Sequence, residues 1–134
     1  MKVVIDTNVV ISAALGSNTC SKVILWVINN TEIIEPNIIA IEIEHFCKRL
    51  AINQKIKNKT QHIEDFFKVF LSFCTIKSPG KILNISTDKP DNHFLSLSLE
   101  ENAIFITGDK LALNFAKNNK IKSSSPGDFL ERMK

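Results

Sequence analysis

Short apolar runs alternate along the chain with longer segments in which apolar residues recur at helical spacing. The short runs are rich in β-branched residues and are typical of buried strands, predicted at 2–5, 32–35, 71–77, 103–106 and 121–123. The longer segments predict helices at 9–15, 20–29, 37–51, 60–70, 91–102 and 110–118, followed by a C-terminal turn at 128–134. Strands that alternate with helices indicate an α/β fold with a mainly parallel sheet of about five strands.

The segment 91–102 has an ambiguous pattern. Leu95, Leu97 and Leu99 alternate as they would in a strand, whereas Asp91 as a possible cap and the length of the segment favour a helix. A family resemblance described below also favours the helix. We therefore predict a helix here.

Composition narrows the class of protein. The 134 residues are expected to form a single domain over 1–134, and no apolar stretch reaches the ~20 residues that would span a bilayer. The apolar run at 3–5 is too short for the core of a signal peptide, so we expect a cytoplasmic protein without a membrane segment. The net charge of +3 is compatible with a nucleic-acid partner and does not require one.

The cysteines and the lysine run suggest no special chemistry. Cys20, Cys47 and Cys74 are far apart and lack CxxC spacing, so reduced thiols mostly within the core are expected rather than disulfides or zinc ligands. The run Lys55-Ile-Lys57-Asn-Lys59 is expected to be a solvated connection, with contact to an RNA backbone as the alternative.

Two aspartates occupy equivalent places in the predicted fold. Asp6 and Asp109 each come just after an apolar strand and just before a helix. In parallel α/β sheets ligands gather outside the carboxyl ends of the strands, so the two acids could share one crevice. Each could instead serve only as a helix cap. Their occurrence together, with further acids, favours a site.

A third acid follows from the amphipathic helix after Pro36. Ile39, Ile43, Phe46 and Leu50 form one narrow apolar stripe at ~100° per residue. On the same helix Glu42 flanks this stripe, whereas Glu44 points towards solvent. Glu42 is therefore predicted to lie at the rim of the core, facing a cleft.

The segment Asp88-Lys-Pro-Asp91 brings two more carboxylates to the start of the next helix. Asp91 is the better candidate because a helix-start position fixes its direction, while Asp88 could close the turn before Pro90. Four converging acids repel one another unless a cation lies between them. Mg²⁺ or Mn²⁺ prefers carboxylate oxygen and water and binds phosphate at the same time, so hydrolysis of a phosphate ester is the predicted chemistry.

At these residues the sequence resembles the PIN-domain nucleases, in particular bacterial PIN proteins of the toxin (VapC-like) type. The matching segments cover nearly the whole chain and comprise 4–13 (VIDTNVVISA), the Glu42 helix, 88–95 (DKPDNHFL), 106–110 (ITGDK) and 125–130 (SPGDFL). The opening and the Thr-Gly-Asp segment are fairly specific together, although each is weak alone.

The resemblance implies a Rossmann-like, three-layer α/β/α domain that uses Mg²⁺ or Mn²⁺ to cleave RNA as an endonuclease. It also implies a small antitoxin protein as partner, and a homodimer. Carried over by position, the metal-binding and catalytic acids are Asp6, Glu42, Asp91 and Asp109, with Asn8, Thr107 and Asp88 in support. Many PIN nucleases carry a further acid shortly after the one that matches Asp109, whereas residues 110–121 contain none here, which puts a second metal ion in doubt.

Two alternatives stay open at this point, a haloacid-dehalogenase-type phosphohydrolase and a PIN-like module without activity. A haloacid-dehalogenase-type phosphohydrolase also begins with a strand and an Asp, but it needs a second Asp two residues later, where this chain has Asn8. A receiver-type signalling domain would need paired acids after the first strand, and that pattern is missing. The non-enzymatic alternative is a PIN-like RNA-binding or protein-interaction module that has lost activity, against which the presence of all four acids argues.

Overall fold

The sheet has five strands, all parallel, in the order β3-β2-β1-β4-β5. The computed structural model describes residues 1–53 and 60–133. Its strands are β1 (Lys2–Ile5), β2 (Glu32–Glu35), β3 (Cys74–Ile76), β4 (Ile104–Ile106) and β5 (Ser123–Ser124). The predicted α/β class and parallel sheet are confirmed. Because β1 lies between β2 and β4, the connections run in opposite directions from its two edges, which is where ligand sites form in such sheets.

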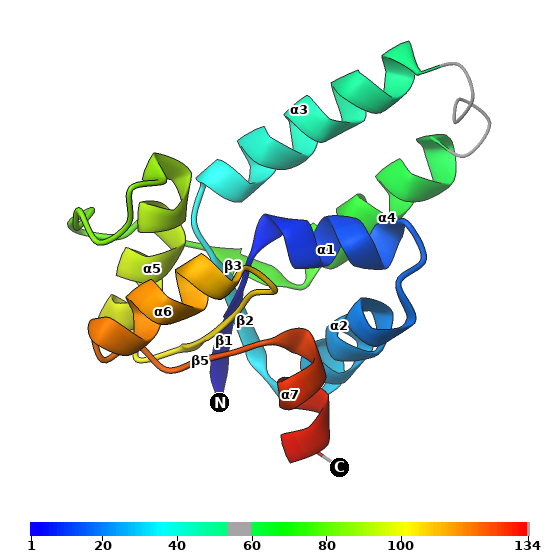
Figure 1. Ribbon diagram of the computed structural model, residues 1–134. Helices are drawn as coiled ribbons and strands as arrows, with labels where there is room; N and C mark the ends of the chain where they lie inside the picture. Colours follow the sequence, from blue (N-terminus) through cyan, green and yellow to red (C-terminus); the bar gives the residue numbers. More distant parts are fainter. Residues whose placement is uncertain (54–59, 134) are drawn as a thin grey trace.

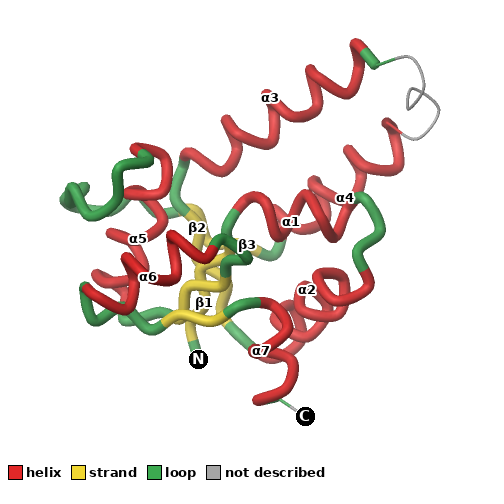
Figure 2. The backbone as a smooth tube through the Cα atoms, in the orientation of Figure 1, coloured by secondary structure: helices red, strands yellow, loops and turns green. Residues whose placement is uncertain are grey.

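The described part of the chain contains seven helices. They are α1 (Thr7–Ala14), α2 (Asn18–Asn30), α3 (Ile38–Ile52), α4 (Thr60–Ser72), α5 (Lys89–Glu101), α6 (Lys110–Asn118) and α7 (Pro126–Arg132). Helices α1, α2 and α7 lie on one side of the sheet and α5 and α6 on the other, while α3 and α4 extend beyond it as a contacting pair (Figure 1). The three-layer arrangement predicted from the family resemblance is thus confirmed, and Figure 2 shows the strands between the helical layers.

The predicted elements differ from the observed ones mainly at their ends. Helix α4 continues to Ser72, so the strand predicted at 71–77 shrinks to β3, because Ile63, Phe67 and Phe70 continue one buried stripe at helical spacing. The predicted C-terminal turn is instead α7. Its start is capped by Ser125, whose Oγ accepts a hydrogen bond from the Asp128 N–H at 3.2 Å.

The core consists of branched aliphatic and phenylalanine side chains from the sheet and the inner helix faces. Trp26 on α2 meets Phe129 on α7 edge to face, with ring centroids 5.5 Å apart, and this pair joins the C-terminal helix to the body of the protein. The three cysteines are free and only partly buried at the margin of the core.

Two further expectations concern the surface. Among the described residues no single helix is long and apolar enough to span a membrane, and α1 and α2 meet that test only together, as a pair bent by 112°. The Lys55–Lys59 run lies entirely outside the described residues.

Candidate active site

Asp6 and Asp109 follow the carboxyl ends of β1 and β4, and Thr107 forms hydrogen bonds with both of them. Thr107 is fully buried, and its Oγ1 donates to Asp6 Oδ2 at 2.7 Å while it accepts from the Asp109 N–H at 3.1 Å. Asp6 also caps α1, since its Oδ1 accepts from the Asn8 N–H at 3.3 Å. Asp109 caps α6, with its Oδ1 2.9 Å from the Leu111 nitrogen. Both acids are caps, and both face the same crevice.

Helix α3 brings Glu42 to the same edge of the sheet. Glu42 Oε1 accepts a hydrogen bond of 2.7 Å from Thr7 Oγ1, in the first turn of α1. Burial raises the pKa of Glu42, the Thr7 bond opposes that rise, and the charges of Asp6 and Asp88 add to it. Glu44 is 63% exposed and pairs with Lys48 at 3.0 Å. The predicted directions of the two glutamates agree with their observed places.

The start of α5 differs from the prediction in its cap. Asp88, not Asp91, caps the helix: its Oδ1 accepts from the Asp91 N–H at 3.4 Å, and its own N–H donates to Ser86 Oγ at 3.0 Å. Pro90 occupies the first turn, where its missing N–H is not needed. Asp91 therefore does not serve as the cap, and it lies partly buried in the first turn of α5.

The acids from these segments act on one another electrostatically. Burial raises the pKa of Asp91 from 3.8 to about 7, with further contributions from the charges of Asp88, Asp6, Asp109 and Glu42. The pKa of Asp6 is likewise raised by burial, against the hydrogen bonds that it accepts, and the charges of Asp109 and Asp88 add to the rise. The fold thus concentrates negative charge at this edge of the sheet, and the charge of His93 opposes the rise in the pKa of Glu42.

The described side chains nevertheless do not form a finished metal cage. No three His, Cys, Asp or Glu side chains among residues 1–53 and 60–133 stand as a set that could hold an ion by themselves. A cavity of about 320 Å³ opens beside Asp6 and Asp109, with Asn8, Ser12 and Gly108 also in its wall. Asn8 is exposed there, and its backbone N–H bonds Asp6. A larger cavity of about 410 Å³ between α2 and α7 contains none of the predicted acids.

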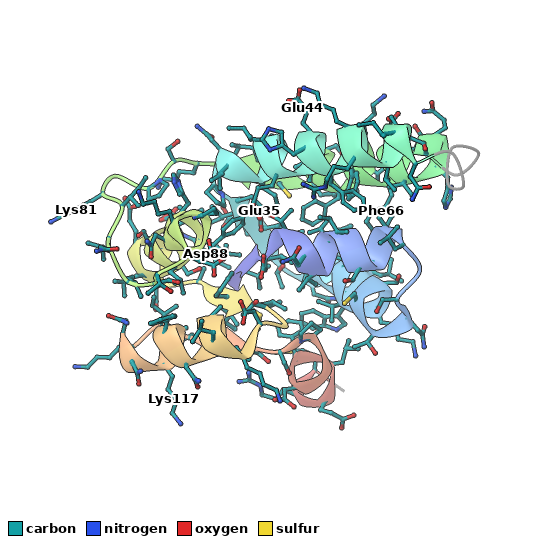
Figure 3. All side chains as sticks on the ribbon, turned by 45° about the horizontal axis from the view of Figure 1, so that its top comes forward. Glu35, Glu44, Phe66, Lys81, Asp88 and Lys117 are labelled. Atoms are coloured by element: carbon teal, nitrogen blue, oxygen red, sulfur yellow. The ribbon has the colours of Figure 1, made fainter. Side chains whose placement is uncertain are left out.

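Sequence reasoning missed one acid and one hydroxyl. Glu35 ends β2 and is fully buried, and its Oε1 accepts from the Ile5 N–H at 2.6 Å. Burial raises the pKa of Glu35 well above its ordinary value, and the nearby charges of Asp6 and Glu42 add to the rise. The signal was available, because Glu35 closes an apolar strand much as Asp6 and Asp109 follow theirs. Thr7, the donor to Glu42, carried no such signal. Figure 3 shows the buried Glu35 beneath α3, the exposed Asp88 beside α5, and Glu44 on the outer side of α3.

A family model described as "PIN domain" matches residues 2–111, which include all four predicted acids. The chain belongs to the PIN-domain family. By sequence the chain is also similar to an uncharacterized protein of Methanocaldococcus jannaschii, 32% identical over 98% of this chain and 90% of that protein's length. The family assignment removes the haloacid-dehalogenase alternative.

Solved structures share this PIN-domain fold at low sequence identity. One chain of VapBC2 from Rickettsia felis, solved with a DNA fragment from its promoter, matches with a TM-score of 0.67 and 15% identity, over 93% of this chain and 98% of that one. A domain of a functionally unknown M. jannaschii protein gives 0.58 at 20% identity, over 92% and 89%. A PilT N-terminus domain protein from Sulfolobus solfataricus gives 0.54 at 17% identity, over 98% and 92%.

Proposed function

We propose that this PIN-domain protein is a metal-dependent endoribonuclease and the toxin component of a toxin–antitoxin pair. The observation that supports the proposal is that Asp6, Glu42 and Asp109, from three separate segments, lie near enough to Asp91 for their charges to raise its pKa. Burial raises the pKa of Asp91 to about 7 and the charges of the neighbouring acids add to the rise, so an ionised Asp91 lowers the stability of the metal-free protein. Such a cost is expected where a cation and a phosphate bind.

The donor set fits Mg²⁺ or Mn²⁺. All four side chains offer carboxylate oxygen, the ligand type that hard divalent ions prefer. Mg²⁺ in particular keeps several waters and is usually held by one or two carboxylates together with a substrate phosphate. The lack of a finished cage in the described side chains is compatible with that mode of binding. When bound, such an ion polarises the phosphate and lowers the pKa of a water.

The protein's own residues orient the acids. Thr107 fixes Asp6 Oδ2 and the Asp109 backbone together, and Thr7 fixes Glu42 Oε1. Asp88 caps the start of α5, where Asp91 lies within electrostatic range of Asp6, Glu42 and Asp109. In the proposed hydrolysis the oxygen of a water forms a bond to phosphorus, one P–O ester bond breaks, and the departing sugar oxygen takes a proton.

The test uses purified protein and a panel of labelled single-stranded RNA, structured RNA and single-stranded DNA. We expect RNA to be cut internally with Mg²⁺ or Mn²⁺, not to be cut in EDTA, and cutting to return when the metal is restored. Full activity in EDTA would refute the metal requirement. Preference for DNA would refute the substrate class, and no cleavage of any substrate would favour the inactive binding module.

A matched pair of variants separates the site from the surface. Asp109→Asn keeps a residue that can cap α6, so the fold should survive while cleavage falls by at least a hundredfold. Asp128→Asn changes an exposed acid in the first turn of α7 and should cleave like the wild type. Equal activity in the two variants would mean that Asp109 is a structural cap.

The partner proposal rests on the shared fold with the VapBC2 chain. Induced expression in a bacterial host should arrest growth, and the Asp109→Asn variant should not. Co-expression of a small protein encoded next to this gene should restore growth and co-purify with the chain. A homodimer is proposed for the protein alone, and light scattering during gel filtration measures its mass.

A further inference from the structure

Glu35 is the most unusual polar residue in the core. It ends β2 with an exposed fraction of 0%, and its Oε1 accepts a 2.6 Å hydrogen bond from the Ile5 N–H. Its Oε2 is buried and has no hydrogen-bond partner among the described residues. A buried carboxyl oxygen without a partner costs stability and calls for an explanation in function.

The Glu35 bond replaces a bond of the sheet. On its β4 side, β1 pairs in register as far as Ile5 opposite Ile106, whereas on its β2 side the register ends at Val3 opposite Ile33. Beyond that point a side chain of β2, in place of a β2 carbonyl, holds the end of β1. The strands therefore separate at the edge where the acids gather.

The residue after Ile5 is Asp6. Its N–H donates to the Ile106 carbonyl at 2.9 Å, so the backbone that carries Asp6 is bonded on one side by β4 and, one residue earlier, by Glu35 on the other side. A neutral carboxyl suits this place, because it accepts the bond without adding a charge to the neighbouring acids. Burial and those acids both favour the protonated form, since they raise the pKa of Glu35.

We propose that Glu35 is a positioning residue of the acidic site, whose bond to the Ile5 N–H fixes the end of β1 and so places the Asp6 carboxylate for divalent metal. The inference rests on the proposed function for the role of the metal, and on the hydrogen bonds alone for the placement of Asp6. It assigns Glu35 no contact with the ion or the substrate. Placing an acceptor at this point leaves the buried Oε2 without a hydrogen-bond partner among the described residues, which lowers the stability of the fold.

Three variants test it. Glu35→Gln keeps an acceptor oxygen for Ile5 and cannot ionise, Glu35→Met keeps the length and removes the acceptor, and Glu32→Met makes the same change at the exposed start of the same strand. Two measurements are made: Mn²⁺ affinity by calorimetry, and amide exchange and chemical shift of Ile5 and Asn8 in metal-free protein. The Asn8 amide reports on Asp6 because it bonds Asp6 Oδ1.

We expect Glu35→Gln and Glu32→Met to keep wild-type affinity and wild-type Ile5 and Asn8 signals. Glu35→Met should lose protection at Ile5, shift Asn8 and bind Mn²⁺ on the order of tenfold more weakly, as residues that orient metal ligands do. A purely structural role would lower the melting temperature without changing the affinity of the folded protein. A purely structural role would also leave the amide chemical shift of Asn8 unchanged.

Several results would overturn the proposal. Wild-type Mn²⁺ affinity in Glu35→Met would show that the bond does not place Asp6, and an affinity loss in Glu35→Gln equal to that in Glu35→Met would show that the ionised carboxylate matters instead. If Glu35→Met does not fold, Glu35→Asp, which withdraws the acceptor by one methylene, should bind Mn²⁺ more weakly, and equal affinity refutes the idea. If the wild type binds no Mn²⁺, the proposed function fails, and an unchanged Asn8 signal in Glu35→Met or Glu35→Asp then separately refutes the positioning role.

Discussion

Asp91→Asn should stabilise the metal-free protein at alkaline pH. Burial and four neighbouring acids raise the pKa of Asp91 from 3.8 to about 7 in the fold. A raised folded pKa means that the native state binds the proton more tightly than the unfolded chain. This contribution to stability is therefore fully present below pH 3.8 and is lost as the pH rises through about 7. Asparagine carries no charge at any pH and avoids the loss.

The size of the effect follows from the same shift. A rise from 3.8 to about 7 corresponds to about 4 kcal/mol without screening. Asp91 is half-buried, and solvent screening reduces this to about 1–2 kcal/mol. An ionised carboxylate in the first turn of α5 regains about 0.5 kcal/mol from the helix dipole, which the variant lacks. The net expectation is about 1 kcal/mol in favour of Asp91→Asn at pH 8, and less at pH 5.

The assay is urea unfolding in EDTA at pH 5 and pH 8. Asp128→Asn is the matched control, because Asp128 also lies in the first turn of a helix with its N–H bonded to the cap, by Ser125 in place of Asp88. It should lose about 0.5 kcal/mol at both pH values, since only the dipole interaction is removed. If Asp91→Asn is destabilised at pH 8 as much as the control, the repulsion argument fails.

Thermal melts with and without Mn²⁺ extend the same comparison of variants. Mn²⁺ should raise the melting temperature of the wild type more than that of Asp91→Asn, because a ligand that binds only the folded state stabilises it by mass action. Cleavage should be absent in the variant. A wild-type melt that Mn²⁺ leaves unchanged, with an Asp91→Asn chain that fails to fold, would show that Asp91 serves the structure and not a site.

Three further outcomes are expected. Glu42→Gln should lower cleavage at least a hundredfold and Glu44→Gln should not, as measured by initial rates on one RNA; equal losses would show that α3 presents the wrong glutamate. Thr107→Val removes the donor to Asp6 and should cost about 1–3 kcal/mol in urea unfolding, and a smaller loss would mean that water replaces the hydroxyl. Phe129→Ala should cost about 3–5 kcal/mol, and an unchanged midpoint would show that α7 contributes little to the fold.

The sequence was sufficient for those parts of the fold that short patterns control. The buried run Val3–Ile5 and the stripe Ile39, Ile43 and Leu50 predicted β1 and α3 because burial selects residues at the period of each element. The ends were harder to predict. Leu71 has the apolar character of either a strand or a helix, and only the packing of Phe70 in the core makes it part of α4.

The candidate site divides in the same way. Asp6, Asp109 and Glu42 could be placed because each is tied to one element, by a strand end or by the helical wheel. The cap of α5 was assigned to Asp91, although Asp88 has the better register for it. Hydrogen bonds between distant segments, such as Thr7 to Glu42 and Glu35 to Ile5, leave no periodic trace in one sequence and could not be predicted.

The bond between Thr107 and Asp6 joins residues 101 positions apart. During synthesis the first strand and α3 leave the ribosome well before the segment that supplies Thr107 and Asp109, and domains fold as their chain emerges. A chain that ends before β4 carries Asp6 and Glu42 but lacks Ile106 and Thr107, which form hydrogen bonds with Asp6 in the fold. The acidic crevice can therefore form only after the segment that carries Thr107 and Asp109 has been made. For the proposed ribonuclease, this order keeps the growing chain inactive towards the message from which it is being made.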